Sequence, residues 1–251
     1  MRENNQLTIP VNAGIPINLS WCLPGAFNIF TRGTSLFYKV KREKVRVEFS
    51  KGFWLSEIPV TVNIWNAVLG DSPRNRFKGM NNDHSPVFGI DYREADFFLE
   101  ALNQLMKVKN QHVVFSLPNY LEWLYACEAK SDENETRFWR DHNDFFRYAW
   151  FKDNSGYSVR EVAKKLPNPW GIYDMYGNIL EMCIDVAAEN GVETIVDPSS
   201  VIDQDMVTVI GGSYLSTFEE CQITKRRAMS GENSFVEPLG LRLICKEILH
   251  M

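Results

Sequence analysis

The sequence lacks a secretory signal, a membrane-spanning run and paired cysteines. Met1 to Gln6 contain one base, one acid and three amides, where a secretory signal would need an apolar core. No uninterrupted apolar run approaches membrane-spanning length. The 5 cysteines follow no CxxC spacing, and an odd number leaves at least one thiol unpaired within the chain. We therefore expect reduced thiols and a cytoplasmic protein.

An excess of positive charge is also missing. The chain has 27 Lys and Arg against 32 Asp and Glu, which gives a net charge of -5. Such a balance provides no general attraction to nucleic acid or to an anionic membrane, so we expect neither as a partner. The 45% hydrophobic and 13% aromatic content is ample for a packed core in a chain of 251 residues.

Hydrophobic periodicity predicts strands first and helices next. Alternation between Lys39 and Val60 indicates strands with one buried face, and helical spacing follows over Thr61 to Leu69 and over Tyr92 to Met106. Asn119 is a good N-cap for a third helix. After residue 130 glycine and proline punctuate the chain, and only short strands are expected, such as Met206 to Ile210 and Leu241 to Cys245. No repeat or linker is evident, which favours one α+β domain with a loop-rich C-terminal half.

The segment from Trp170 to Glu181 carries two carboxylates at short spacing in a tight aromatic turn. Asp174 and Glu181 supply charged oxygens, and Gly177 and Ile179 lie between them with carbonyls that a turn could leave free. Calcium takes six to eight oxygen ligands from carboxylates, carbonyls and water, so the run is chemically suited to it. The other interpretation is a Gly-Asn turn between two buried segments with solvated acids.

Several motifs occur in a fixed order between residues 24 and 245. They are Pro24-Gly25-Ala26-Phe27, Leu117-Pro118 with Glu122-Trp123 and Tyr125-Ala126, Gly171 to Glu181, Gly211-Gly212-Ser213-Tyr214 and Gly240-Leu241-Arg242. This ordered set resembles the formylglycine-generating enzyme family, also called sulfatase-modifying factors, whose domain is a variant of the C-type lectin fold. The resemblance implies that residues 24–251 form one such domain after an N-terminal extension over residues 1–23.

The resemblance has two implications for metal binding. The family binds calcium in the loop described above, which implies a structural calcium held by the side chains of Asp174 and Glu181 and the carbonyls of Gly177 and Ile179. Active members also hold copper(I) between two cysteine thiolates spaced five apart, and soft thiolates suit this soft ion. Here the first of these positions is Ser216 and only the second, Cys221, is a cysteine.

Ser216 is evidence against copper-dependent oxidation by this chain, because a neutral hydroxyl is a poor ligand for copper(I). Other site positions also lack the residue that the family pattern has there, which likewise argues against the family's chemistry: Pro59, Ser116, Leu180 and Ile210. A protein can keep the fold of an enzyme family without keeping the family's chemistry. We therefore expect a non-catalytic module, not the copper-dependent oxidation, that binds a protein or small-molecule ligand through its loop-rich C-terminal half.

Two alternatives stay open. The first is a divergent metal-dependent oxidoreductase that acts on a cysteine or another sulfur substrate through Cys221, whose thiol pKa the nearby run from Lys225 to Arg227 would lower. The alternative reading of Cys221 is a small buried core residue. The second is a display protein whose residues 213–238 vary among sibling copies. An iron centre would need clustered histidines, and His84, His112, His142 and His250 are far apart in sequence.

Overall fold

The computed structural model describes residues 5–12, 14–32, 42–71, 82–130, 139, 141–186, 192–201, 206–222, 227–230 and 238–248. Its helices are α1 (Val62–Leu69), α2 (Tyr92–Val108), α3 (Tyr120–Glu128) and α4 (His142–Phe145). Its strands are β1 (Gln6–Asn12), β2 (Ile15–Cys22), β3 (Gly25–Arg32), β4 (Arg42–Phe49), β5 (Phe53–Ser56), β6 (Val113–Ser116), β7 (Leu180–Cys183), β8 (Asp185–Val186), β9 (Thr194–Val196), β10 (Ser200–Val201), β11 (Met206–Ile210), β12 (Arg227–Ser230), β13 (Leu239–Leu241) and β14 (Ile244–Ile248).

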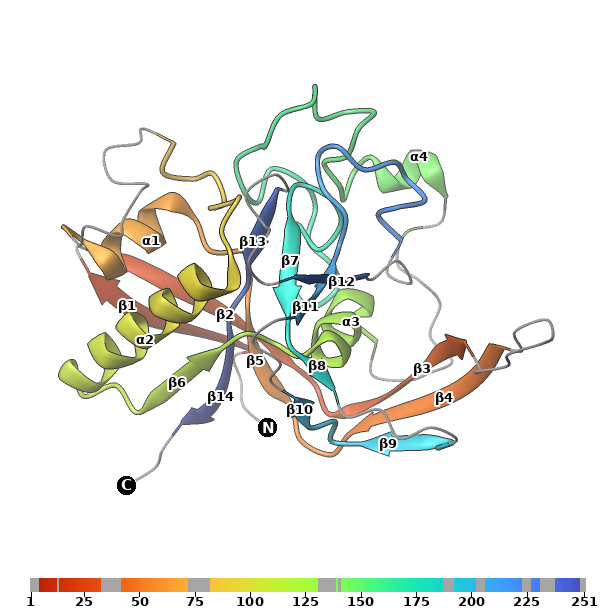
Figure 1. The fold of residues 1–251 in the computed structure, drawn as a ribbon, viewed down its shortest axis with the longest axis horizontal. Coiled ribbons are helices and arrows are strands. Elements are labelled where there is room, and N and C mark those ends of the chain that lie inside the picture. The colour runs from red at the N-terminus through yellow and green to blue at the C-terminus, as the bar shows by residue number, and fades with distance from the viewer. Residues whose placement is uncertain are drawn as a thin grey trace.

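The described strands form separate small sheets (Figure 1). The largest has five strands in the order β1-β2-β5-β14-β6, and a four-stranded sheet has the order β12-β11-β7-β13. A three-stranded sheet, β3-β4-β9, extends to one side of the molecule, and β10 pairs with β8. Because helices and strands are mixed and the part after residue 130 is mostly loops, the predicted α+β class is confirmed.

Helices α1 and α2 cover the five-stranded sheet. Trp65 stacks on Phe98 with ring centroids 4.7 Å apart, and both pack in one core with Ile17 and Phe115 of the sheet. A capping box at Asp91 begins α2, since its side chain accepts from the Glu94 N–H and the Glu94 side chain accepts from the Asp91 N–H. The two helices predicted from apolar spacing are thus confirmed; α1 begins one residue later than predicted and α2 ends two residues later.

Helix α3 lies in a second core beneath the loop-rich half. Asn119 caps it in a second capping box with Glu122, so the predicted N-cap is confirmed. The helix is buried on nearly every side, and its side chains pack with aromatic residues from the loops after residue 138. Tyr125, for example, meets Trp170 edge-on at 5.1 Å. This core fixes the loops that carry the candidate site.

One predicted strand is wrong in its extent. The run from Leu241 to Cys245 is divided between β13 and β14, with Arg242 and Leu243 between them. The chain leaves the four-stranded sheet at this point and enters the five-stranded one, so a single strand cannot continue. The strands predicted at Met206 to Ile210 and within Lys39 to Val60 are confirmed, although residues 39–41 lie outside the described part of the chain.

Residues before Pro24 contribute two strands, β1 and β2, to the largest sheet. The division of the chain at residue 23 stays a prediction. None of the described helices is long and apolar enough to cross a membrane.

Candidate functional site

The turn from Trp170 to Glu181 is held by backbone contacts that need unusual conformations. Asp174, Gly177 and Asn178 have φ values of 56°, 73° and 59°, all in the left-handed region. A Cβ at Gly177 would overlap the carbonyl oxygen of Trp150, and the Asn178 N–H donates to that same oxygen at 2.6 Å. The Gly177 N–H donates to the Gly211 carbonyl at 2.8 Å. Glycine at position 177 is therefore required by both conformation and space.

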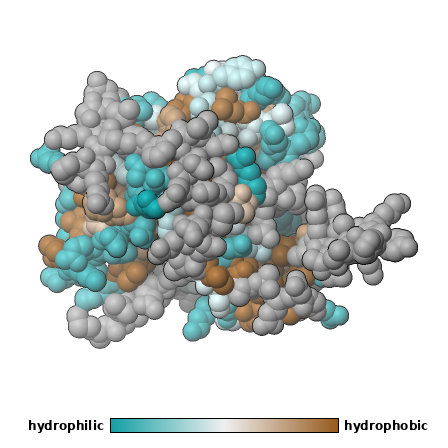
Figure 2. Space-filling model, viewed as in Figure 1, coloured by the Kyte–Doolittle hydropathy of each residue, from teal (hydrophilic) through white to brown (hydrophobic). Residues whose placement is uncertain are grey.

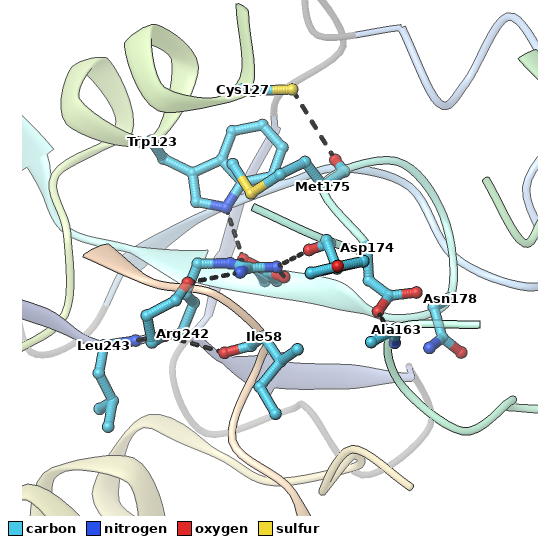
Figure 3. Close-up of polar contacts among 12 residues, drawn as sticks. Ile58, Trp123, Cys127, Ala163, Asp174, Met175, Asn178, Arg242 and Leu243 are labelled. Carbon is cyan, nitrogen blue, oxygen red and sulfur yellow. Dashed lines mark hydrogen bonds and ion pairs between the residues drawn. The ribbon is translucent and has the colours of Figure 1, made fainter. Parts of the chain in front are cut away.

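At the end of this turn, Glu181 is bound by a buried arginine. Arg242 donates from Nε to Oε2 at 2.9 Å and from Nη2 to Oε1 at 2.8 Å, and both side chains are inaccessible to solvent. Trp123 Nε1 also donates to Oε2, at 2.6 Å, so Trp123 and Arg242 converge on one carboxylate (Figure 3). A bidentate arginine–carboxylate pair fixes orientation as well as charge.

Arg242 also joins distant parts of the fold. Its Nη1 donates to the Ser56 carbonyl at 2.8 Å and its Nη2 to the Tyr173 carbonyl at 2.7 Å. The guanidinium therefore connects the end of β5, the turn before Asp174 and strand β7. The charge balance of the core depends on this residue, because a buried carboxylate without a partner is strongly unfavourable.

Asp174 is the second carboxylate of the turn and lacks such a partner. Its Oδ2 accepts from the Ala163 N–H at 2.7 Å, whereas its buried Oδ1 has no hydrogen-bond partner among the described residues. Burial is the main cause that raises the pKa of Asp174 to about 6, and the nearby charge of Glu181 raises it as well. The Ala163 N–H, Arg242 and Asn178 lower this pKa but do not outweigh burial. Figure 3 shows Asp174 beside Ala163 and Asn178.

These atoms fit a hard cation at Asp174. The unpartnered Oδ1 is an oxygen ligand of the kind that calcium takes. The described loops contain no backbone hydrogen bond to the carbonyl of Gly177 or Ile179. Glu181 differs from Asp174, because Arg242 already balances its charge. Its Oε2 accepts two of the hydrogen bonds named above and its Oε1 accepts one, so Oε1 has the greater remaining capacity to bind a cation. Asp174, Gly177, Ile179 and Glu181 therefore stay the predicted ligand set.

Ser216 and Cys221, the two positions that correspond to the copper cysteines of the family, lie in the segment that follows β11. The Ser216 Oγ accepts from the Ser213 N–H at 3.0 Å, which engages the hydroxyl within the turn. Cys221 is fully buried, and a Cβ at Gly212 would lie 2.6 Å from its Sγ. Burial, with Glu220 and Glu219 nearby, raises the pKa of Cys221 to about 12. The thiol is therefore protonated at neutral pH.

The described charged residues that act on Cys221 are acidic. The basic run was expected to lower the thiol pKa, and that effect stays a prediction. Among the described residues, the carboxylates Glu220 and Glu219 raise the pKa of the thiol. Lys225 and Arg226 lie outside the described residues, and Arg227 begins β12. The burial of Cys221 and its raised pKa favour the interpretation as a buried core residue, and its assignment as a catalytic residue stays a prediction.

The described residues contain no group of three or more His, Cys, Asp or Glu side chains that could hold a metal ion. His84, His112 and His142 are among these residues, and His250 is outside them. The part of the site that sequence reasoning missed is the role of Arg242 and Trp123. Both occur in the motifs quoted above, so the signal was present, but the motifs alone do not show that the two side chains meet at Glu181.

The fold and this site define a sulfatase-modifying-factor-like domain. The pattern for the "Sulfatase-modifying factor enzyme 1-like domain" matches residues 19–247, and the chain belongs to that family. The resemblance inferred from the ordered motifs is thus confirmed. No curated protein matches the chain.

Solved structures share the fold at low sequence identity. The chain is similar to Treponema denticola variable protein 1, with 20% identity and a TM-score of 0.72 over 97% of this chain and 100% of that one. It is similar to PvdO from Pseudomonas aeruginosa, with 16% identity and a TM-score of 0.72 over 98% and 100%. It is also similar to CarF, with 17% identity and a TM-score of 0.55 over 91% and 98%. At these identities the likeness concerns the fold alone.

Proposed function

We propose that this chain is a binding module that keeps the family fold without the copper-dependent oxidation of cysteine. The observation that carries the proposal is the pair of residues at the copper positions. Ser216 offers a neutral hydroxyl that is engaged with Ser213, and Cys221 is buried with its pKa raised to about 12. Copper(I) prefers soft ligands, so the neutral Ser216 hydroxyl is a poor ligand for it. The raised pKa of Cys221 weakens copper binding further, because the thiol must lose its proton to bind the ion.

Incubation of the protein with copper(I), oxygen and a cysteine-containing peptide tests this proposal. Mass spectrometry of the peptide should show no enzyme-dependent oxidation product beyond the level found with copper(I) alone. A product that accumulates over many turnovers, and that disappears in Cys221→Ala, would instead establish the oxidoreductase alternative.

The binding surface is assigned to the loop-rich C-terminal half, with a protein or small-molecule ligand as partner. The turns of this half are fixed by the core around α3, and loops on a rigid scaffold are where binding residues concentrate.

A cytoplasmic location is part of the proposal, and the five free cysteines among the described residues support it. One fold neighbour is described as a variable protein. If this chain is also a variable display protein, differences among sibling copies should cluster in residues 213–238.

We further propose a structural calcium ion held by Asp174, the Gly177 and Ile179 carbonyls and Glu181. The buried, unpartnered Oδ1 of Asp174 supports it. Isothermal titration of chelator-treated protein should show one calcium site that is lost in Asp174→Asn, which removes the charge but keeps the shape. An absence of calcium binding at millimolar concentration would refute the site without affecting the proposed binding function.

A further inference from the structure

Strand β3 forms one border of the three-stranded sheet that extends to the side of the molecule (Figure 1). It pairs with β4 from Gly25 to Arg32 without a register shift, and it pairs with no second strand among the described residues. The border of a sheet carries backbone N–H and C=O groups that another extended chain can pair with. The question is therefore which groups of β3 point outward.

The contacts on the far side of β4 fix the direction of the Phe30 backbone. The Arg46 N–H donates to the Glu193 carbonyl at 2.9 Å, so the backbone groups of Arg46 point toward β9 and away from β3. Antiparallel strands alternate between residue pairs that exchange hydrogen bonds and pairs that do not. Lys44, two positions before Arg46, therefore forms a pair without hydrogen bonds with Phe30. The N–H and C=O of Phe30 thus point out of the sheet, and no backbone hydrogen bond in the described part of the chain uses them.

The side chain of Phe30 adds an exposed ring to this border. It is 64% exposed, whereas Ile29 points to the other face of the sheet and packs against the core around α3. Ala26, in the first half of the strand, is only 6% exposed, so the accessible part of the border is the half that contains Phe30. The sequence from Gly25 to Thr31 has no charged residue and no proline. Figure 2 shows exposed hydrophobic residues toward the lower right, where Figure 1 places this sheet.

Both borders of the five-stranded sheet are protected against such pairing. On β1, Pro10 lacks an N–H, and the register shifts between Pro10 and Asn12. On β6, the side chain of Asn103 binds the Phe115 backbone, since its Oδ1 accepts from the N–H at 2.8 Å and its Nδ2 donates to the C=O at 2.9 Å. Prolines, bulges and covering groups are the usual means by which proteins block a free strand. At Phe30 the described residues supply none of them.

We infer that β3 pairs with β3 of a second copy of this chain, antiparallel and with Phe30 opposite Phe30. A two-fold axis through this point lets each copy satisfy the unpaired N–H and C=O of the other, and both rings then lie on the same face of one continuous sheet. Aromatic pairs directly across antiparallel strands are favourable. The inference is independent of the proposed binding function, because it concerns another part of the molecule.

Charge favours a second copy as the occupant. The uncharged run from Gly25 to Thr31 brings no like charges together when it faces itself. The nearest described basic side chain on this face is Lys44, on the next strand. The two copies of Lys44 would lie three strand spacings apart, roughly 14 Å. This separation exceeds the Debye length of about 8 Å at physiological salt, so their repulsion is largely screened.

Sedimentation velocity of the full chain, from micromolar to submillimolar concentration, tests the inference. The wild type should show a monomer–dimer equilibrium. Phe30→Pro removes the ring and the outward N–H but no hydrogen bond to β4, so it should raise the dimer dissociation constant at least about tenfold. Phe30→Lys keeps the N–H and places two cations at the two-fold axis, so it should weaken the dimer as well. Circular dichroism checks that both variants are folded.

Cross-linking of Phe30→Cys tests the register. Opposite residues of a hydrogen-bonded antiparallel pair have Cα atoms about 5.5 Å apart, a distance that a disulfide can span. Mild oxidation should therefore give a covalent dimer, and the native cysteines are all buried and should not compete. Val108→Cys is the matched control, since Val108 at the end of α2 is 70% exposed, and it should stay mainly monomeric.

Three results would overturn the inference. The first is a wild type that stays monomeric over the whole concentration range. The second is a dimer that Phe30→Pro and Phe30→Lys leave unchanged, since its interface would lie elsewhere. The third is cross-linking of Phe30→Cys that is no faster than that of Val108→Cys.

Discussion

Arg242 and Glu181 form an ion pair with no solvent contact, in which Nη2 lies 2.8 Å from Oε1 and Nε lies 2.9 Å from Oε2. The pair joins β7 to the crossing between β13 and β14, and thus two sheets. The pair matters for stability, because removal of one partner would leave the other as an unpaired charge buried away from water.

Arg242→Met should lower the free energy of unfolding by about 3–5 kcal/mol, because it leaves the Glu181 carboxylate buried and unpaired. Urea unfolding followed by circular dichroism measures the loss. The control is Lys164→Ala, which breaks an exposed pair with Glu161 at 3.1 Å and should change stability by less than about 1 kcal/mol. Equal effects of the two variants would contradict the role given to Arg242.

The stability of the calcium-free protein should depend on pH through Asp174. Its pKa is raised from 3.8 to about 6 in the folded state, so the folded protein binds this proton more tightly than the unfolded chain does. The stabilisation from protonation is fully present below 3.8 and is lost as the pH rises through about 6. Asp174→Asn should therefore be more stable than the wild type at pH 7, by about 3 kcal/mol.

Thermal unfolding in the presence of a chelator, between pH 4 and pH 8, checks this prediction. The difference between Asp174→Asn and wild type should shrink as the pH falls through about 6. A difference that stays constant over this range would show that Asp174 is not the titrating group.

Gly177→Ala and Gly14→Ala separate backbone strain from steric overlap. Both glycines have positive φ, at 73° and 78°. A Cβ at Gly14 meets nothing within 4 Å, whereas one at Gly177 would overlap the Trp150 carbonyl. Gly14→Ala should destabilise by about 1 kcal/mol and Gly177→Ala by more than about 3 kcal/mol. Similar unfolding midpoints for the two variants would be inconsistent with the close packing of the turn.

The thiols should be inert in the folded protein. All five cysteines are buried, and burial raises the pKa of Cys221 to about 12. Titration with a chromogenic disulfide reagent should detect less than one thiol per chain before unfolding and all five after it. Rapid labelling of Cys221 in the native protein, located by peptide mass spectrometry, would revive the reactive-thiol interpretation.

The sequence indicated those parts of the fold that depend on local interactions. Apolar spacing located α1 and α2, and the side chain of Asn119 marked the start of α3. Ordered motifs then identified the family. Each of these signals lies within a short stretch of chain, where propensity, capping and periodicity act directly.

Contacts between distant residues could not be predicted in this way. Glu181 and Arg242 are 61 positions apart, and no spacing rule brings them together. The strand expected from Leu241 to Cys245 is divided because the chain changes sheets at Arg242. For Cys221, the described charged groups that act on the thiol are the carboxylates Glu219 and Glu220, whereas Lys225 and Arg226 lie outside the described residues.

Anaerobic titration with copper(I), in competition with a chromogenic chelator, tests most directly whether this chain has lost the copper chemistry. With Ser216 in place of one thiol and Cys221 buried, the protein should leave the chelator's copper(I) undisturbed. Withdrawal of one equivalent of copper(I) from the chelator by the wild type, but not by Cys221→Ala, would contradict the proposed function.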